Sequence, residues 1–277
     1  MILSAKPAAD AINAATARRL AALPRRAHLR VVLVGHNAGS EVYVRNKGKR
    51  AAELGADFGL DRLDESTTQE ALLAHVRALG ADPAVTAILV QVPLPAHLDP
   101  VPVMAAVPPH KDVDGFSPEN FGRALGGDPL AVPSCTPAGI LALLDHYGVA
   151  LAGKEAVVIG KSNIVGKPTA VMLGNRDATV TVCHKGTLDL ASHTRRADVL
   201  VVAAGCPGLV RGDMVKPGAT VIDVGINRLA DGKIAGDCDF DAISKIADVS
   251  PVPGGVGPMT MAMLFSNLAT LAERAAR

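Results

Sequence analysis

Two side chains that can do chemistry lie four residues apart near the start of the chain. Tyr43 and Lys47 follow the glycine-rich segment 35–39, and the pattern from 40 to 54 predicts a helix with Ser40 as its N-cap. Residues four apart share one face of a helix, so the aromatic ring and the ammonium group can reach the same ligand. A tyrosine and a lysine at this spacing are more often an exposed surface pair, so the spacing alone is a weak indication of a site.

A glutamine interrupts a second apolar run. The segment from Thr86 to Val92 predicts a buried strand, and Gln91 lies at its carboxyl end. A polar group in an apolar strand needs a hydrogen-bonding partner. Ligands of open α/β sheets bind at the carboxyl ends of the strands, so we expect Gln91 at a ligand site.

The motif from Lys111 to Gly115 carries two carboxylates, Asp112 and Asp114. In extended geometry, residues separated by one position point to the same side, and a metal site is conceivable. Two carboxylates without further ligands are too few for a dedicated calcium site, and a solvated turn is the commoner explanation. We therefore predict no metal site.

A glycine turn follows the predicted strand 156–159. The turn runs from Gly160 to Gly166 and precedes a helical pattern, an order that aims backbone N–H groups at a pyrophosphate. Its spacing departs from the usual dinucleotide fingerprint, because Ser162 takes the place of the second glycine. The alternative is that the glycines only permit a tight turn between strand and helix.

The end of the next predicted strand, 179–183, indicates the type of cofactor. An NAD site would place a carboxylate near this point to hold the ribose hydroxyl, whereas the chain places His184 and Lys185 there. Lys161 and Lys185 offer two cations to a 2′-phosphate, which favours NADP. The alternative is that both lysines are solvated surface residues.

Apolar, β-branched runs alternate with helical patterns along the whole chain, which is typical of parallel sheets covered by helices. The fold class we expect is α/β, with two α/β domains, a C-terminal Rossmann-like doubly wound parallel sheet, and an active-site cleft between the domains. Capping-box spacing in 66–69 precedes a predicted helix over 71–79. The remaining predicted elements are strands at 29–34, 199–203 and 220–224 and a terminal helix over 259–275. The stretch from Pro93 to Pro137 is rich in proline and glycine and predicts a loop-rich rim.

Composition excludes several classes of partner. Lys+Arg 28 against Asp+Glu 27 gives a formal charge of +1, which removes the electrostatic case for general binding to nucleic acid or a membrane surface. The start of the chain lacks the pattern of a signal peptide and no apolar run is long enough to span a bilayer, so we expect a cytoplasmic protein.

The four cysteines are widely spaced and form no Cys-x-x-Cys pair, which argues against a zinc site and against a disulfide framework. We expect four reduced thiols. Cys183 cannot work with His184 as a nucleophile and base, because adjacent residues on a strand point to opposite faces.

Seven motifs in a fixed order carry a family resemblance. They are Tyr43 to Lys47, the Gln91 segment, Lys111 to Gly115, Cys135 to Pro137, Gly160 to Gly166, Asp223 to Asn227, and Pro251 to Thr260. Together they resemble the bifunctional methylenetetrahydrofolate dehydrogenase and methenyltetrahydrofolate cyclohydrolase family along nearly the whole chain. The last motif is especially specific to that family.

The resemblance implies oxidation of 5,10-methylenetetrahydrofolate by hydride transfer to NADP, followed by hydrolysis of the methenyl product to 10-formyltetrahydrofolate in the same cleft. It implies a homodimer, with tetrahydrofolate derivatives as substrates. The change of pattern near residue 139 indicates the domain junction, and the terminal helix could pack back on the first domain. We therefore expect a folate-binding catalytic domain formed by residues 1–138 and the C-terminal helix 258–277, and an NADP-binding domain over residues 139–257.

The resemblance also assigns roles to single residues. Lys47 is similar to the residue that transfers protons in the hydrolysis, and Gln91 to the hydrogen-bonded residue that tunes it. Tyr43 is similar to a ring that stacks on the aminobenzoyl part of folate, and Asp114 to the pterin anchor. The implied substrate-binding set is Tyr43, Val44, Arg45, Asn46, Lys47, Val90, Gln91, Val92, Asp114, Pro253, Gly254, Gly255, Val256 and Gly257. The implied cofactor contacts are Gly160, Lys161, Ser162, Lys185 and Ile226.

One position departs from the family pattern, because many members carry serine where this chain has Lys185. Two alternatives to the implied function remain. The chain could be a folate- and NADP-binding module without turnover, which the presence of Tyr43, Lys47, Gln91 and Asp114 disfavours. It could also be a related dehydrogenase acting on a small acid such as shikimate, which the Pro251 to Thr260 motif disfavours.

Overall fold

The computed structural model describes residues 1–277 and divides into two compact units. Unit 1 comprises Met1–Ala11, Ala124–Pro129 and Ser134–Met263. Unit 2 comprises Ile12–Arg123, Leu130–Pro133 and Leu264–Arg277. Helices α1 (Lys6–Ala21) and α10 (Val256–Ala275) each contribute residues to both units, and the chain also passes between the units within the segment 123–134.

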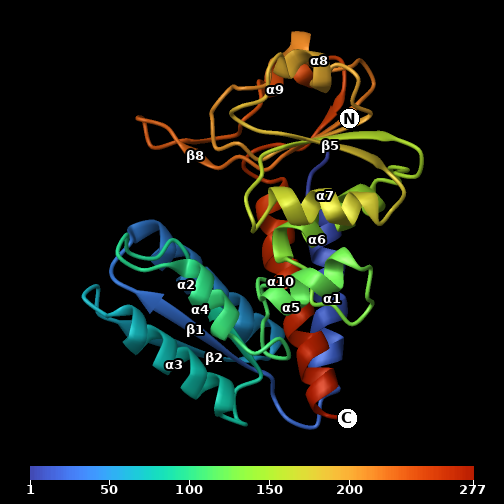
Figure 1. Cartoon of the computed structure of the whole chain (residues 1–277). Coiled ribbons are helices and arrows are strands. Elements are labelled where there is room, and N and C mark those ends of the chain that lie inside the picture. The colour runs from blue at the N-terminus through green and yellow to red at the C-terminus, as the bar shows by residue number, and fades with distance from the viewer. The chain divides into compact units, whose positions relative to one another are not determined.

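Unit 2 is built on a three-stranded parallel sheet in the order β2-β1-β3. Its strands are β1 (His28–Val34), β2 (Asp57–Leu63) and β3 (Ala87–Val90). The connecting helices are α2 (Ala38–Leu54) and α3 (Gln69–Ala81), and α4 (Pro100–Ala106) and α5 (Pro118–Leu125) follow β3. Figure 1 labels β1 and β2 of this sheet and the helices α2, α3 and α4 of the same unit. The central strand β1 is a nearly continuous apolar run, because a parallel strand with neighbours on both edges buries both of its faces.

The core of unit 2 gathers the apolar side chains of the sheet and of α3. Leu72, Val76 and Leu79 recur every three or four residues, so they form one stripe along α3. The full cluster is Val32, Val34, Leu72, Val76, Leu79, Val85, Ile88, Val90, Leu98, Val103 and Val107. This burial fixes the end of β3, and with it the position of the next residue, Gln91.

Both helix caps predicted in unit 2 lie at other residues. The N-cap of α2 is Asn37, whose side chain accepts a hydrogen bond from the backbone N–H of Ser40 at 2.9 Å. The prediction of Ser40 is wrong because an acceptor three residues earlier satisfies the first turn, which leaves Ser40 inside the helix and buried. The N-cap of α3 is Thr68, whose hydroxyl accepts from the backbone N–H of Ala71, so the capping box predicted to start at Ser66 is also wrong.

Unit 1 is built on a five-stranded parallel sheet in the order β10-β7-β6-β4-β5. The strands are β4 (Glu155–Ile159), β5 (Thr179–Cys183), β6 (Val199–Val202), β7 (Thr220–Asp223) and β10 (Asp248–Val249). The chain moves from β4 to β5 on one side and then returns to β6 on the other, so the strand order reverses beside β4. This reversal is the position at which doubly wound sheets bind dinucleotides.

Helices and a short hairpin complete unit 1. The helices are α6 (Cys135–His146), α7 (Gly166–Gly174), α8 (Leu190–Thr194), the 3-10 turn η1 (Gly212–Met214) and α9 (Phe240–Ile243). The hairpin pairs β8 (Asn227–Arg228) with β9 (Ile234–Ala235). The parallel sheets of both units, with helices between their strands, confirm the predicted α/β class.

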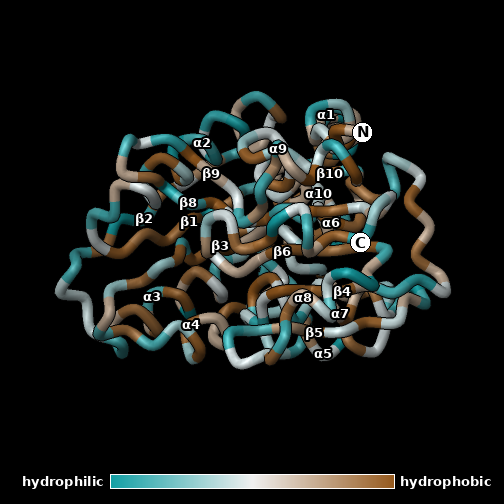
Figure 2. The backbone as a smooth tube through the Cα atoms, turned by 90° about the horizontal axis from the view of Figure 1, so that it is seen from above, coloured by the Kyte–Doolittle hydropathy of each residue, from teal (hydrophilic) through white to brown (hydrophobic).

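Hydrophobic residues are concentrated in the buried strands and hydrophilic residues in the loops that connect them, as expected for sheets covered by helices. Figure 2 shows hydrophobic residues along many of the interior segments and hydrophilic residues in many of the connecting loops. Strands β3, β4, β6 and β7 are formed almost entirely of buried residues. None of the helices has the length and apolar character that crossing a bilayer would require.

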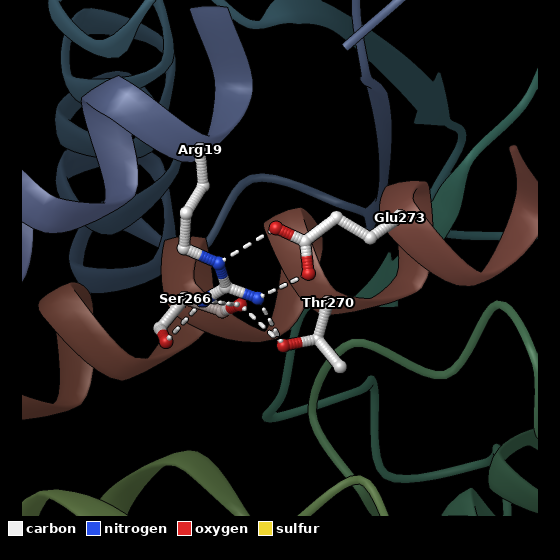
Figure 3. Close-up of polar contacts among 4 residues, drawn as sticks. All are labelled: Arg19, Ser266, Thr270 and Glu273. Carbon is white, nitrogen blue, oxygen red and sulfur yellow. Dashed lines mark hydrogen bonds and ion pairs between the residues drawn. The ribbon is translucent and has the colours of Figure 1, made fainter. Parts of the chain in front are cut away.

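An arginine clamp in unit 2 joins the last turns of α1 and α10 (Figure 3). The Arg19 guanidinium donates to both carboxylate oxygens of Glu273, from Nε at 2.8 Å and from Nη2 at 2.9 Å. It also donates to the hydroxyls of Thr270 at 2.7 Å and Ser266 at 3.3 Å. The hydrogen bond from Arg19 lowers the pKa of Glu273. This forked geometry fixes two helices together through residues that are 254 positions apart in sequence.

Candidate active site and cofactor site

Lys47 and Gln91 meet in unit 2. Helix α2 carries Lys47, and the residue after β3 is Gln91, which is 8% exposed. The Lys47 Nζ donates to Gln91 Oε1 at 2.8 Å, and Gln91 Nε2 donates to the backbone carbonyl of Val92 at 2.7 Å. The backbone N–H of Gln91 donates to the carbonyl of Val32 at 2.9 Å, which ties this residue to β1. The amide is therefore held with its oxygen toward the lysine.

The neighbours of Lys47 on α2 divide into exposed and buried side chains. Tyr43, one turn earlier, is 46% exposed, and Arg45 and Asn46 are exposed as well. Val44 is 2% exposed and belongs to the interior of unit 2, as does Val90 at the end of β3. The two valines thus support the site from within, while the aromatic ring and the lysine are accessible from solvent.

The two carboxylates of the 111–115 motif lie in different environments. Asp112 is 3% exposed, and its carboxylate accepts hydrogen bonds from the backbone N–H groups of Phe116 and Ser117 and from Asn120 Nδ2. Asp114 lies in a turn and is half-buried. The expectation of an extended segment is wrong here, because the chain turns at residues 113 and 114. The Asp112 carboxylate instead accepts hydrogen bonds from the backbone immediately before α5.

Lys111, from the same motif, binds the C-terminal end of α3, a structural role that the sequence motif did not indicate. Its side chain is 8% exposed, and Nζ donates to the backbone carbonyls of Asp82 at 2.6 Å and Leu79 at 3.4 Å. These carbonyls lie at the C-terminal end of α3, where a cation is favourable. Burial lowers the pKa of Lys111.

Two glycines of the turn after β4 occupy positions that have no room for a Cβ atom. Gly160 has φ +123°, and a Cβ there would lie 2.3 Å from the carbonyl oxygen of Ala203. A Cβ on Gly166 would lie 2.0 Å from the carbonyl oxygen of Gly160. The Ser162 hydroxyl accepts from the backbone N–H groups of Val165 at 3.1 Å and Gly166 at 3.3 Å, so it holds the turn that precedes α7. This packing is the cradle expected of a turn that receives a phosphate group.

The two lysines expected at the cofactor follow adjacent strands. β4 and β5 pair in parallel, with Ile159 opposite Cys183, so Lys161 and Lys185 each stand two residues beyond a strand end at the same sheet edge. Both side chains are exposed. The structure thus brings two cations to the edge of the sheet next to the glycine turn.

Two further loops reach the same edge of unit 1, after β6 and after β7. The β7 loop carries Ile226, which is 55% exposed although it is a large apolar residue. The loops are held by the buried carboxylates of Asp223 and Asp237. Desolvation raises the pKa of Asp223, against the opposing effect of its backbone hydrogen bonds. The sequence motif had drawn attention to Asp223, whereas Asp237 was missed because one aspartate in a turn-rich segment carries no spacing signal.

The segment before α10 forms a tight turn in unit 1. Gly254 has φ +105°, and its carbonyl accepts from the backbone N–H of Ala5 at 2.9 Å. A Cβ on Gly255 would lie 2.5 Å from the carbonyl oxygen of Pro251. Gly254 and Gly257 are exposed and Pro253 is exposed too, whereas Gly255 and Val256 are buried. The buried positions therefore anchor the turn and leave the others accessible.

Cysteine and metal chemistry have little support in the geometry. Cys135, Cys183 and Cys238 are buried, and desolvation raises the pKa of the Cys183 thiol, which disfavours its reactive form. Cys206 is exposed. No group of three histidine, cysteine, aspartate or glutamate side chains is placed to hold a metal ion.

Comparison with known proteins identifies the family. Residues 3–114 match the tetrahydrofolate dehydrogenase/cyclohydrolase catalytic domain, and residues 134–276 match the NAD(P)-binding domain of the same family. The bifunctional protein FolD of Lacticaseibacillus paracasei is 55% identical over 249 residues, which cover 90% of this chain and 88% of the relative.

Solved structures agree with this match. The bifunctional FolD methylenetetrahydrofolate dehydrogenase/cyclohydrolase of Campylobacter jejuni has a TM-score of 0.97 and 45% identity, with 99% of each chain covered. The FolD of Trypanosoma brucei, complexed with NADP cofactor and inhibitor, has a TM-score of 0.96 and 39% identity, with 100% of this chain and 98% of that chain covered. The expected resemblance is confirmed, and the chain belongs to the tetrahydrofolate dehydrogenase/cyclohydrolase family.

Proposed function

We propose that the chain oxidises 5,10-methylenetetrahydrofolate to 5,10-methenyltetrahydrofolate with NADP and then hydrolyses this product to 10-formyltetrahydrofolate in one shared active site. The observation that carries the proposal is the Lys47–Gln91 hydrogen bond of 2.8 Å within a family catalytic domain. This hydrogen bond supports the proposal, because a neutral amide orients the basic side chain of Lys47, and the family motifs imply a folate-binding role for both residues.

In the hydrolytic step, water adds to the methenyl carbon and loses its first proton, and the bond from that carbon to N5 then breaks. Lys47 is the group we assign to accept this first proton and to deliver it to the departing N5, while the new hydroxyl group releases the second water proton to solvent as the formyl C=O bond forms. A lysine acts as a base only when it has lost its own proton, and a neutral partner favours that form more than a carboxylate would. Gln91 meets this requirement, since its amide orients Nζ without adding a charge.

The remaining folate contacts follow the same reasoning. The exposed ring of Tyr43 is available for stacking on the aminobenzoyl group, and Asp114 is the carboxylate we assign to the pterin donors. Arg45, Asn46, Val92 and the turn from Pro253 to Gly257 complete the substrate-binding set, with Val44 and Val90 supporting it from the core.

NADP is the cofactor we propose, and when bound it supplies the hydride acceptor. The Gly160 to Gly166 turn fits the pyrophosphate, because it leads from β4 into the N-terminus of α7, and its two glycines allow a close approach of backbone to backbone that a Cβ would prevent. Lys161 and Lys185 stand at the adjacent strand ends, where a 2′-phosphate can accept charge-assisted hydrogen bonds from both. Ile226 offers an exposed apolar contact in the sequence motif that follows β7.

We also propose the organisation of the molecule. Folate binds to the domain formed by residues 1–138 and 258–277, NADP binds to residues 139–257, and the protein works as a cytoplasmic homodimer. Light scattering coupled to gel filtration measures the assembly directly. A monomer at the concentration used in the assays would contradict the dimer.

An absorbance assay tests the proposed function. Purified protein mixed with methylenetetrahydrofolate and NADP should form NADPH, and protein mixed with methenyltetrahydrofolate should remove the absorbance of that substrate. Calorimetric binding of both ligands without turnover would instead identify a binding module, and turnover of neither folate would refute the proposal.

A further inference from the structure

A buried carboxylate that the proposed chemistry does not use joins two loops of unit 1. Asp237 is 0% exposed, and its Oδ2 accepts hydrogen bonds from the backbone N–H groups of Ala204 at 2.7 Å and Gly205 at 2.9 Å. Its Oδ1 accepts from the backbone N–H of Cys206 and from Asn227 Nδ2, both at 2.8 Å. Four donors thus converge on one side chain, three from the loop after β6 and one from the segment after β7.

A second carboxylate fixes the segment that carries the first. Asp223, at the end of β7, accepts hydrogen bonds from the backbone N–H groups of Gly225 at 2.9 Å, Asp237 at 3.0 Å and Cys238 at 2.9 Å. A Cβ on Gly225 would lie 2.3 Å from Asp237 Oδ1, and a Cβ on Gly236 would lie 2.0 Å from Asp223 Oδ2. Both glycines therefore provide the space in which the carboxylates reach the backbone.

The two loops occupy a defined part of the sheet edge. Segment 203–206 follows β6 and segment 224–227 follows β7, and these strands are neighbours in the order β7-β6-β4-β5. Lys161 and Lys185 follow β4 and β5, on the other side of the reversal. A dinucleotide lies across such a crevice. The proposed function assigns Lys161 and Lys185 to the 2′-phosphate at the adenosine end, which leaves the loops after β6 and β7 for the nicotinamide end.

The shape of the β6 loop depends on its internal anion. Three successive N–H groups that point to one centre form a nest that binds anions. In this loop the nest is filled by Asp237, so it is closed to the phosphates of a dinucleotide. The pyrophosphate is left to the glycine turn after β4, and the β6 loop is held in a single conformation beside it.

We propose that Asp237 is a positioning residue that holds segments 203–206 and 224–227 in the shape that receives the nicotinamide half of the cofactor. The inference rests on the proposed NADP-dependent function and adds a residue to it. Asp237 acts through the backbone of the two loops, since its oxygens are occupied by their N–H groups and by Asn227.

The test compares a whole cofactor with its adenosine half. Calorimetry measures binding of NADP and of adenosine 2′,5′-bisphosphate to the wild type and to the Asp237→Asn variant. An asparagine offers one acceptor oxygen and turns an NH₂ group toward backbone N–H donors, so the loops lose their anchor. NADP binding should weaken by roughly tenfold to a hundredfold, the size of effect expected when a positioned group shifts. Binding of adenosine 2′,5′-bisphosphate and the rate of methenyl hydrolysis should match the wild type.

Two more variants separate positioning from general damage. Asn227→Ala removes one of the four donors and should also weaken NADP binding, by a smaller factor than Asp237→Asn. This second variant keeps the test valid if Asp237→Asn does not fold. Val215→Ala changes a buried residue of the same core outside both loops, and should lower the melting temperature while leaving both ligands bound as in the wild type.

Each outcome has a distinct meaning. Equal weakening of both ligands in Asp237→Asn would show a structural role only, and unchanged binding of NADP in both loop variants would overturn the inference. A wild-type protein that binds neither ligand would refute the proposed cofactor itself.

Discussion

Replacing Gln91 by glutamate tests the electrostatic role of the neutral amide. The variant Gln91→Glu places a carboxylate about where Oε1 now lies, 2.8 Å from Lys47 Nζ. Opposite charges about 4 Å apart attract by about 4 kcal/mol at an effective dielectric constant of 20. Because Lys47 is only half-buried, solvent screens part of this attraction. We therefore expect the rate–pH profile of methenyl hydrolysis to move toward alkaline pH by about 1–3 pH units.

The consequence at neutral pH is large. Moving the profile by one pH unit reduces the unprotonated fraction of the lysine about tenfold, so hydrolysis should fall by roughly 10- to 1000-fold. Reduction of NADP should change less, because the nicotinamide provides that chemistry. The assay is methenyl absorbance followed over a range of pH, at saturating substrate.

The control is Gln91→Met, which removes the hydrogen-bond acceptor and adds no charge. Its rate should fall through loss of orientation, and its profile should not move toward alkaline pH. If the profile of Gln91→Glu coincides with that of the wild type, the lysine does not act as a base beside this residue and the reasoning fails.

Three further outcomes follow from the structure. Replacing Lys161 and Lys185 together by alanine should reduce the preference for NADP over NAD, with each lost contact costing about 1.5–3 kcal/mol of binding free energy if it is enclosed. The ratio of kcat/KM for the two cofactors measures this preference, and a wild-type protein that prefers NAD would contradict the assignment. Asp114→Ala should weaken folate binding by about 1–3 kcal/mol, while a chelator changes neither rate; chelator-sensitive activity would contradict it. Glu273→Gln should cost about 1 kcal/mol or less of unfolding free energy, since both partners of the pair with Arg19 are about one-third exposed. The lowered pKa of Glu273 means that this contribution is present above the ordinary value of 4.5 and is lost as pH falls below it, so denaturant melts of wild type and variant should converge in acid.

Periodicity and turn residues predicted most strands of the two parallel sheets and three of the longer helices, α2, α3 and α10. The strands β1, β4, β6 and β7 were predicted within one residue at either end, because parallel strands with neighbours on both edges are nearly continuous apolar runs. Strand β5 lies at the edge of its sheet and is only partly buried, but its β-branched residues were enough to predict it. Strand β2 was missed since it lies at the edge of its sheet and carries Asp57, Asp61 and Arg62. Helix α1 was missed as well, because its small and charged residues give no clear apolar stripe.

The sequence predicted those parts of the candidate site that are formed by residues close together in the chain. The helical spacing of Tyr43 and Lys47 and the glycine turn after β4 follow from short segments. The hydrogen bond between Lys47 and Gln91 joins residues 44 positions apart, and motif order suggested it without fixing its geometry. Asp237 was beyond sequence reasoning, because its partners come from loops that only the strand order brings together.

Hydrolysis of methenyltetrahydrofolate by the Lys47→Met variant is the decisive measurement for the proposed role of this lysine. The variant keeps the apolar stem of the side chain and removes the amine, so NADP binding by calorimetry should remain close to the wild type. Loss of a proton-transferring group reduces a rate by roughly a hundredfold or more, and we expect at least that loss here. A variant that retains more than about a tenth of the wild-type hydrolysis rate would show that Lys47 is not the catalytic base.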